Sequence, residues 1–316
     1  MNIHAIVDYS FLYYKYKFQL DSGKMKRLTA PVVVDGVDTE KDVSQIFYSI
    51  KEIEGFRRTL EKAGHSVVIS VCFDMPSSRK DTNEDATDSE NEAASKYKSN
   101  RVKRLTDEDF DNIMLAEEML SDAGHNTYRI TGYEADDIVA HLVDKYSDSF
   151  DYSIIYTPDA DLLAHVGPKV GASRYKVYKG YTSVDVNNFS EYLSAEMKCR
   201  LPYNALMLFK CTCGDTSDQI AGIRKFGPKA FDKLIDYLDE KGVTWEYRGS
   251  YKETLDLLEV SRGYLTEDQV RQALESLSLV RPMMVEDGTL ADPIKVSNKL
   301  LRMESYMRYA MASLVE

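Results

Sequence analysis

The chain has 316 residues, of which 43% are hydrophobic, and a formal net charge of −12 at pH 7. This length allows one large domain, or a core domain with a smaller second one. No apolar run approaches the ~20 residues of a membrane-spanning helix, and the N-terminus lacks the features of a signal peptide, so we expect no membrane association.

The excess of acidic residues, taken alone, argues against nucleic acid as a partner. The average misleads here because the acid is concentrated, in the segment DTNEDATDSENE and in several short motifs. The cysteines form no CxxC pair and have no histidine at metal-ligand spacing, which indicates free thiols in a cytoplasmic protein. They are Cys72, Cys199, Cys211 and Cys213.

Three short apolar runs are predicted to be buried strands, at 4–7, 66–73 and 152–157. Each ends at or just before aspartate. Helical spacing of apolar residues lies between these runs, at 43–62, 107–123 and 136–146. Strands that alternate with helices predict an α/β fold with a mostly parallel central sheet flanked by helices. Chemistry in such sheets gathers at the carboxyl ends of the strands.

The middle and the end of the chain have a different character. Residues 81–92 are polar and acidic without an apolar period, which is typical of a mobile insertion, and the basic run YKSNRVKRL at 97–105 follows. From about residue 202 onward the sequence is mostly helical, interrupted by a turn at KFGPKAF. Helical spacing recurs at 253–260, 267–279 and 299–314.

The stretch GYEADDIVAHLV at 132–143 crowds three carboxylates beside an apolar helical stripe. One interpretation is a capping box between Thr131 and Glu134 at a helix start, where acidic side chains also suit the helix dipole. The other is a metal site. Glu134 and Asp137 are three residues apart on one face, and Asp136 lies about 100° from Asp137. Asp136 and Asp137 are the better candidates for close metal contact.

Two further motifs resemble this one. TPDADLL places Asp159 and Asp161 just after a strand, and CGDTSDQI places Asp215 and Asp218 in a loop, where each could equally be a helix cap. Together the carboxylates at expected site edges number nine: Asp8, Asp74, Glu134, Asp136, Asp137, Asp159, Asp161, Asp215 and Asp218. Without histidine or cysteine among them, zinc is disfavoured and two Mg²⁺ ions are favoured, with Mn²⁺ as a substitute. Two such ions can activate a water and steady the leaving oxygen of a phosphodiester.

In this order the motifs resemble those of the 5′-nuclease superfamily, the flap endonucleases, phage 5′→3′ exonucleases and 5′-nuclease domains of bacterial DNA polymerases. The similar segments are VDYSFLYYK, CFD, YKSNR, YEADD, PDADL and GDTSDQIAGIRKFGPKAF. The resemblance implies a PIN-like nuclease core over 1–200, with a helical arch at about 75–130. It also implies a helical duplex-binding region over 201–316, with a helix–turn–helix clamp at about 213–240. The acidic insertion and the modest length suggest a phage enzyme, which would act in the host cytoplasm.

The resemblance also implies roles for basic and aromatic residues. Lys98 would face the scissile phosphate and Arg101 would help to hold it, while Tyr97 would lie beside the terminal base. Lys225 stands where the family has the first glycine of GIG, in a turn that commonly binds K⁺. The full set of expected DNA contacts is Lys15, Tyr97, Lys98, Arg101, Lys103, Arg104, Arg224, Lys225, Gly227 and Lys229.

We therefore predict a metal-dependent 5′ nuclease, a flap endonuclease or 5′→3′ exonuclease, in replication or repair. Its expected substrates are branched or 5′-ended DNA, nicked duplex and RNA primers in RNA–DNA hybrids. Catalysis is assigned to Lys98, Arg101, Asp136 and Asp159, and the amphipathic C-terminal segment LLRMESYMRYAMASL is a candidate contact for a replication protein. The alternatives are a PIN-like ribonuclease, which the GDTSD…KFGPK segment disfavours, and a non-catalytic protein that binds branched DNA.

Overall fold

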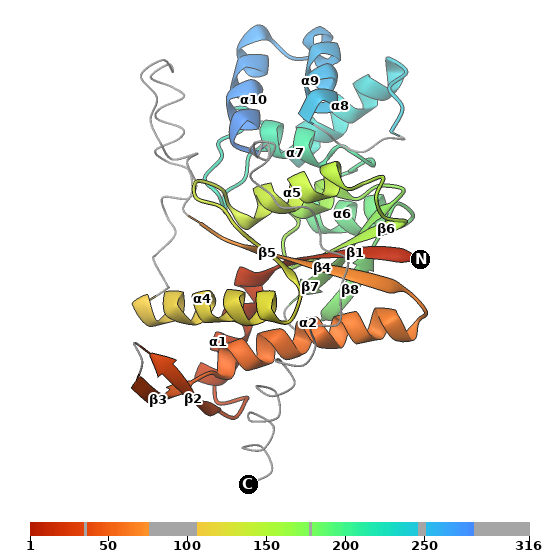
Figure 1. Ribbon diagram of the computed structural model, residues 1–316. Helices are drawn as coiled ribbons and strands as arrows, with labels where there is room; N and C mark the ends of the chain where they lie inside the picture. The colour runs from red at the N-terminus through yellow and green to blue at the C-terminus, as the bar shows by residue number, and fades with distance from the viewer. Residues whose placement is uncertain (35–36, 76–105, 177–178, 246–250, 281–316) are drawn as a thin grey trace.

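The computed structural model describes residues 1–34, 37–75, 106–176, 179–245 and 251–280. A six-stranded sheet with the order β5-β4-β1-β6-β7-β8 forms its middle layer (Figure 1). The first five strands in this order are parallel, and β8 pairs with β7 in the antiparallel sense. The bounds are β1 Asn2–Asp8, β4 Ser66–Phe73, β5 Asn126–Arg129, β6 Tyr152–Thr157, β7 Val170–Lys176 and β8 Gly180–Val184.

The central strand β1 is apolar from Ile3 to Val7 apart from His4, as expected for a strand that is covered on both faces. It pairs with β4 on one side and β6 on the other, so Asp8 lies opposite Cys72 and one position beyond the last pair with β6. The carboxyl ends of β1, β4 and β6 therefore meet at one edge of the sheet. The mostly parallel α/β architecture predicted from sequence is confirmed.

Helices cover both faces of the sheet (Figure 1). Three helices pack on one face through a core that includes Val7, Ile50, Ile69 and Ile113. Their bounds are α1 Tyr9–Asp21, α2 Ser44–Lys62 and α4 Asp107–Asp122. The other face carries α5 Ala135–Lys145, the short 3₁₀ helix η2 Asp161–His165 and α6 Phe189–Met197. A two-stranded hairpin, β2 Thr29–Val34 with β3 Val37–Asp42, stands apart from the main sheet.

The last described part of the chain is helical and lies beyond α5 and α6, at the top of Figure 1. It comprises α7 Leu206–Cys213, α8 Pro228–Glu240, α9 Tyr251–Val260, η3 Ser261–Gly263 and α10 Glu267–Val280. One hydrophobic core joins this part to the sheet, since it runs from Ile6 and Ile138 to Leu208 and Leu277. The division of the chain at residues 200/201 remains a prediction.

Most elements lie where the sequence predicts them. The predicted strands 66–73 and 152–157 match β4 and β6, and the predicted helices differ from α2, α4, α5, α9 and α10 by at most two residues at either end. The hairpin β2–β3, the strands β5, β7 and β8, and helix α6 were not predicted. The predicted helix 299–314 and the insertion 81–92 lie outside the described residues.

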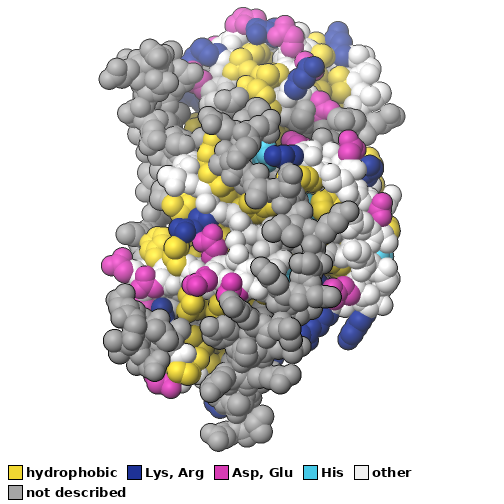
Figure 2. Space-filling view, in the orientation of Figure 1, with side chains coloured by type: hydrophobic (Ala, Val, Ile, Leu, Met, Phe, Trp, Pro, Cys, Tyr) yellow, Lys and Arg dark blue, Asp and Glu magenta, His cyan; other side chains and the backbone are white. Residues whose placement is uncertain are grey.

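Two surface properties follow from these elements. Acidic side chains gather along the exposed side of α4 (Figure 2), so part of the net negative charge lies on an outer helix. None of the helices in the described ranges is long and apolar enough to cross a membrane.

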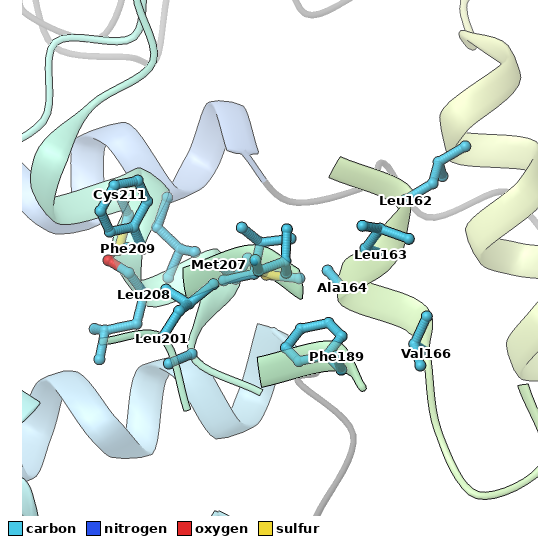
Figure 3. Close-up of a cluster of buried hydrophobic side chains, with 14 of the residues drawn as sticks. Leu162, Leu163, Ala164, Val166, Phe189, Leu201, Met207, Leu208, Phe209 and Cys211 are labelled. Carbon is cyan, nitrogen blue, oxygen red and sulfur yellow. Dashed lines mark hydrogen bonds between the residues drawn. The ribbon is translucent and has the colours of Figure 1, made fainter. Parts of the chain in front are cut away.

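The helix η2 is fixed against α7 by apolar contacts. Leu163 and Ala164 of η2 face Met207 of α7 in Figure 3, and all three are buried. Asp161 is the first residue of η2, so this packing also determines where its carboxylate lies.

We expect Leu163→Ala to lower the free energy of unfolding by about 2–5 kcal/mol, because it leaves a cavity at a fully buried position. Urea denaturation measures the loss. The matched control is Leu274→Ala on α10, whose side chain is 37% exposed and should change stability by only about 0.5 kcal/mol. Equal losses in the two variants would contradict the packing role of η2.

Candidate active site

Asp8 ends the central strand and is almost wholly buried, with 8% of its surface exposed. Thr157, the last residue of β6, donates a hydrogen bond from Oγ1 to Asp8 Oδ2 at 3.3 Å. Burial, with the negative charges of Asp74 and Asp159, raises the pKa of Asp8 to about 8. A buried carboxylate among other carboxylates favours a bound cation, which would restore its ionised form.

Asp74 follows β4 and binds the start of α5, since its Oδ1 accepts the backbone N–H of Ala135 at 2.8 Å. The helix is capped one step earlier by Glu134, whose own N–H donates to Asp137 Oδ2 at 3.0 Å. The capping box predicted between Thr131 and Glu134 is therefore wrong. The chain is still turning before Glu134, with Gly132 at φ +88°, so the helix begins later than the motif suggests.

The two neighbouring acids of this helix have different surroundings. Asp137 is fully buried and engaged as the cap partner of Glu134. Asp136 is half-buried and lines a small cavity with Glu134, Asp161 and Asp218. Of the two candidates for close metal contact, Asp136 has the better placement, and Asp137 orders the helix start.

The turn after β6 is held by side chains that bond to the backbone. Asp159 N–H donates to Thr157 Oγ1 at 3.0 Å, and Asp161 N–H donates to Asp159 Oδ1 at 2.9 Å. Burial and the charge of Asp159 raise the pKa of Asp161 to about 7. These bonds place both carboxylates at the same edge as Asp8.

The loop after α7 brings two more acids. Asp215 and Ile220 exchange backbone hydrogen bonds of 2.8 Å, which closes the loop between them. The closure needs glycine at Gly222, because a Cβ there would lie 2.3 Å from the backbone nitrogen of Gly214. Within the loop, Asp215 Oδ1 accepts hydrogen bonds from the N–H and Oγ of Ser217, at 2.8 and 2.5 Å.

Asp161, Asp215 and Asp218 form the tightest acidic group among the described residues, with one oxygen of each within 4.8 Å of the others. Oxygens that ligate one Mg²⁺ at ~2.1 Å lie at most about 4.2 Å apart, so these three could share an ion after small movements. The donor set is entirely carboxylate, which suits a hard divalent cation. The chemistry of these three predicted ligands therefore fits a bound Mg²⁺ or Mn²⁺ ion.

A cavity of about 550 Å³ opens beside this group, lined by Asp8, Asp159, Asp161 and Asp215 among others. The smaller cavity that Asp136 lines adjoins it, since Asp161 and Lys210 contribute to both. Seven of the nine predicted ligands therefore line these two cavities. Asp74 is coupled to Asp8 by charge, and Asp137 is buried behind the helix start.

Lys210 was missed by the sequence prediction. It projects from α7 into the acidic group, where its Nζ donates to Asp161 Oδ1 and, at 2.6 Å, to Asp215 Oδ2. Burial acts to lower its pKa, but the charges of Asp161 and Asp215 outweigh that effect and raise it. Its charge and hydrogen bond also bring the pKa of Asp215 to about 2 against the opposing effect of burial. The available signal was a single lysine in the otherwise uncharged helix LMLFKCTC.

The family model described as the 5′-3′ exonuclease, N-terminal resolvase-like domain, matches residues 5–194. The chain belongs to the 5′-3′ exonuclease family. The sequence-based assignment to the 5′-nuclease superfamily, and to a nuclease that hydrolyses phosphodiesters, is confirmed at this level. The matched segment holds Asp8 and the strand-end acids up to Asp161, but not the loop with Asp215.

Individual relatives agree with this assignment. A 5′-3′ exonuclease of Mycoplasmopsis pulmonis is 26% identical over 223 residues, which are 68% of this chain and 70% of that protein. A 5′-3′ exonuclease of Bacillus subtilis is 30% identical over 179 residues, which are 54% of this chain and 51% of that protein. The bacteriophage T5 flap endonuclease, solved in a complex with DNA and metal ions, has a TM-score of 0.55 at 15% identity over the whole of both chains. This last likeness shows a shared fold.

The turn before α8 includes Lys225, at the position where the resemblance to the superfamily leads us to expect glycine. Lys225 adopts φ +61°, the left-handed conformation that glycine tolerates best. Gly227 is the N-cap of α8 and Pro228 its first residue. The turn is anchored to α10, because Arg224 N–H donates to Gln272 Oε1 at 2.8 Å. The side chains of Arg224, Lys225 and Lys229 are exposed.

Lys15, predicted to contact DNA phosphate, is paired with an acidic side chain of the protein instead. Its Nζ donates to Glu52 Oε2 at 2.6 Å, and its side chain is 12% exposed. The ammonium also lies over the ring of Tyr175, 4.4 Å from the centroid. A direct phosphate contact would require this half-buried ion pair to open. The predicted arch residues Tyr97, Lys98, Arg101, Lys103 and Arg104 lie outside the described residues.

The raised pKa of Asp8 predicts how pH acts on the metal-free protein. Between the ordinary value of 3.8 and the folded value of about 8, the unfolded chain loses a proton that the folded chain keeps, so Asp8 lowers stability progressively as pH rises. In EDTA, Asp8→Asn should therefore raise the melting temperature at pH 8 and have little effect near pH 4. Thermal unfolding across this range measures the difference. Asp148→Asn, at a position 98% exposed, is the control, and a pH-independent effect of Asp8→Asn would refute the shift.

Proposed function

We propose that the chain is a structure-specific 5′ nuclease that cleaves branched or 5′-ended DNA, including 5′ flaps and nicked duplex, and RNA primers in RNA–DNA hybrids. The observation that supports it most is the convergence of strand-end and loop carboxylates around two adjoining cavities. The products would carry a 5′-phosphate and a 3′-hydroxyl. We further propose action on cytoplasmic DNA, which agrees with the four free cysteines, of a host cell if the source is a phage.

Two Mg²⁺ ions, replaceable by Mn²⁺, are the proposed cofactors. Asp8, Asp74, Glu134, Asp136 and Asp159 would hold one, and Asp161, Asp215 and Asp218 the other, with Asp137 ordering the start of α5. Bound there, the ions would lower the pKa of a water and balance charge on the leaving oxygen. The chain's own part is to hold these oxygens in place, with Asp74 and Thr157 fixing the two strand ends. Asp136 and Asp159 are the proposed catalytic carboxylates.

The proposed duplex contact is the turn with Arg224, Lys225, Gly227 and Lys229, as a helix–turn–helix clamp within 213–240. Its exposed cations, beside the positive end of the α8 dipole, are features that bind phosphates. K⁺ remains a proposed ligand of this turn, in which Lys225 has a left-handed backbone conformation. The helical region 201–316 would then grip duplex, and the arch with Lys98 and Arg101 the scissile phosphate. Contact of the C-terminal segment with a replication protein also stays a proposal.

Loss of one proposed metal ligand should abolish cleavage and spare binding. Asp159→Asn and Asp136→Asn should each lower turnover on an end-labelled 5′ flap by more than about 100-fold. Removing a residue that only hydrogen-bonds to a metal ligand typically costs less, about 10–100-fold. DNA affinity, measured by fluorescence anisotropy, should stay within about threefold because neither residue belongs to the clamp.

The control is Asp148→Asn, which lies on the exposed surface. Matched 3′-flap, nicked and single-stranded substrates, with RNA versions of each, separate the proposal from its alternatives. Preference for single-stranded RNA would favour a PIN-like ribonuclease, and tight flap binding without cleavage in Mg²⁺ would favour a non-catalytic protein. Full activity of both variants, or in EDTA, would refute the metal assignment.

The clamp makes its own prediction. Lys229→Ala should weaken binding to duplex of any sequence and reduce the slope of log affinity against log salt by about 1, because one phosphate contact is lost. Lys169→Ala is the control. Lys169 is exposed and directly precedes β7, so it lies at the amino ends of the parallel strands and not at the carboxyl ends where the acids gather. An unchanged salt slope for Lys229→Ala would exclude this residue from the interface.

A further inference from the structure

Lys210 places a positive charge inside the proposed metal centre. Its side chain is 8% exposed, and its ammonium bridges Asp161 on η2 and Asp215 in the loop after α7. These are two of the three carboxylates that form the tightest acidic group among the described residues. A residue of the chain thus contacts the oxygens that a divalent cation would use.

The hydrogen bonds of Asp215 show where a metal ion would meet Lys210. Its Oδ1 accepts two bonds from Ser217, which belong to the turn of the loop itself. Its Oδ2 accepts the bond from Lys210. Because Ser217 already engages both lone pairs of Oδ1, a cation that binds Asp215 without disturbing the loop that positions Asp218 would have to use Oδ2, the oxygen that Lys210 contacts.

Their charges make the two cations competitors. An ammonium and a divalent cation on the same carboxylates repel each other, more strongly in a partly buried site than in open water. Without either of them, Asp161, Asp215 and Asp218 would repel one another in turn. The centre needs a positive charge at this point, and Lys210 supplies one from within the fold.

We propose that Lys210 is an internal counter-cation that competes with a divalent cation for Asp161 and Asp215. It holds this half of the centre together in the metal-free protein, and it makes metal binding there weak enough to be reversible. This inference rests on the proposed function, because it assumes that the same carboxylates bind metal. Lys210 is a positioning residue whose effect is seen in metal affinity.

The test is calorimetric titration of the full chain with Mn²⁺ at pH 7.5, without DNA. Lys210→Met removes the charge but keeps an apolar side chain of similar length. It should bind the weaker of two Mn²⁺ ions at least about tenfold more tightly than the unsubstituted protein does, since a like charge has gone. In EDTA the same variant should melt at a lower temperature, and saturating Mn²⁺ should raise its melting temperature more than that of the unsubstituted protein.

Two further proteins localise the effect. Lys169→Met, which removes an exposed lysine, should leave Mn²⁺ affinity unchanged. In an Asp218→Asn background, Lys210→Met should lose most of its gain in Mn²⁺ affinity, because the third carboxylate of the Mn²⁺ site is then missing.

The outcomes separate this inference from the proposed function. If the unsubstituted protein binds no Mn²⁺, the metal centre itself is refuted. If it binds Mn²⁺ and Lys210→Met binds with equal or lower affinity, only the competition is refuted. Lys210→Gln repeats the test should the methionine variant fold poorly. Failure of both neutral variants to fold in saturating Mn²⁺ would also overturn the proposal, because a bound ion should replace the missing charge.

Discussion

Repulsion among carboxylates at one edge of the sheet is the constraint on which the rest of the structure depends. Asp8 is buried there beside the charges of Asp74 and Asp159, and its pKa is raised accordingly. Each neighbouring acid has a local partner that offsets part of the repulsion. Asp74 binds the positive end of α5, and Asp215 binds Lys210. The folded chain thus assembles a strongly negative centre by giving separate acids separate partners.

That centre is positioned by ordinary packing at a distance from it. Asp161 is held in place because the apolar side of η2, with Leu163, packs on α7. The loop that carries Asp215 is closed by the near contact of Gly214 with Gly222 and backed by α10, where Ser276 Oγ accepts the N–H of Gly222 at 3.1 Å. The helical end of the chain therefore takes part in building the site, in addition to any contact that it makes with duplex.

The sequence predicts those parts of the site that depend on local pattern. Strand ends marked by Asp8, Asp74 and Asp159 could be recognised because a buried apolar run stops where the aspartate begins. Lys210 could not, because its pairing with Asp161, 49 residues away, arises only when η2 docks on α7. The capping residue of α5 was misassigned because the chain still turns at Gly132, so the cap is Glu134 and not Thr131. Strand β7, VGASRYK, escaped because it has neither an apolar run nor strict alternation.

The same electrostatics bears on how a polyanion could approach the cavity. Of its lining residues, Arg174 and Lys210 carry positive charge, and both are engaged with carboxylates. Arg174 pairs with Glu196, with one bond of 3.0 Å, and Lys210 with two aspartates. A phosphate entering the metal-free cavity would thus meet a negative field. Cations held by Asp8, Asp159, Asp161 and Asp215 would reverse that field and so favour entry of a phosphate, while exposed cations such as Lys229 would attract duplex at a distance from the acids.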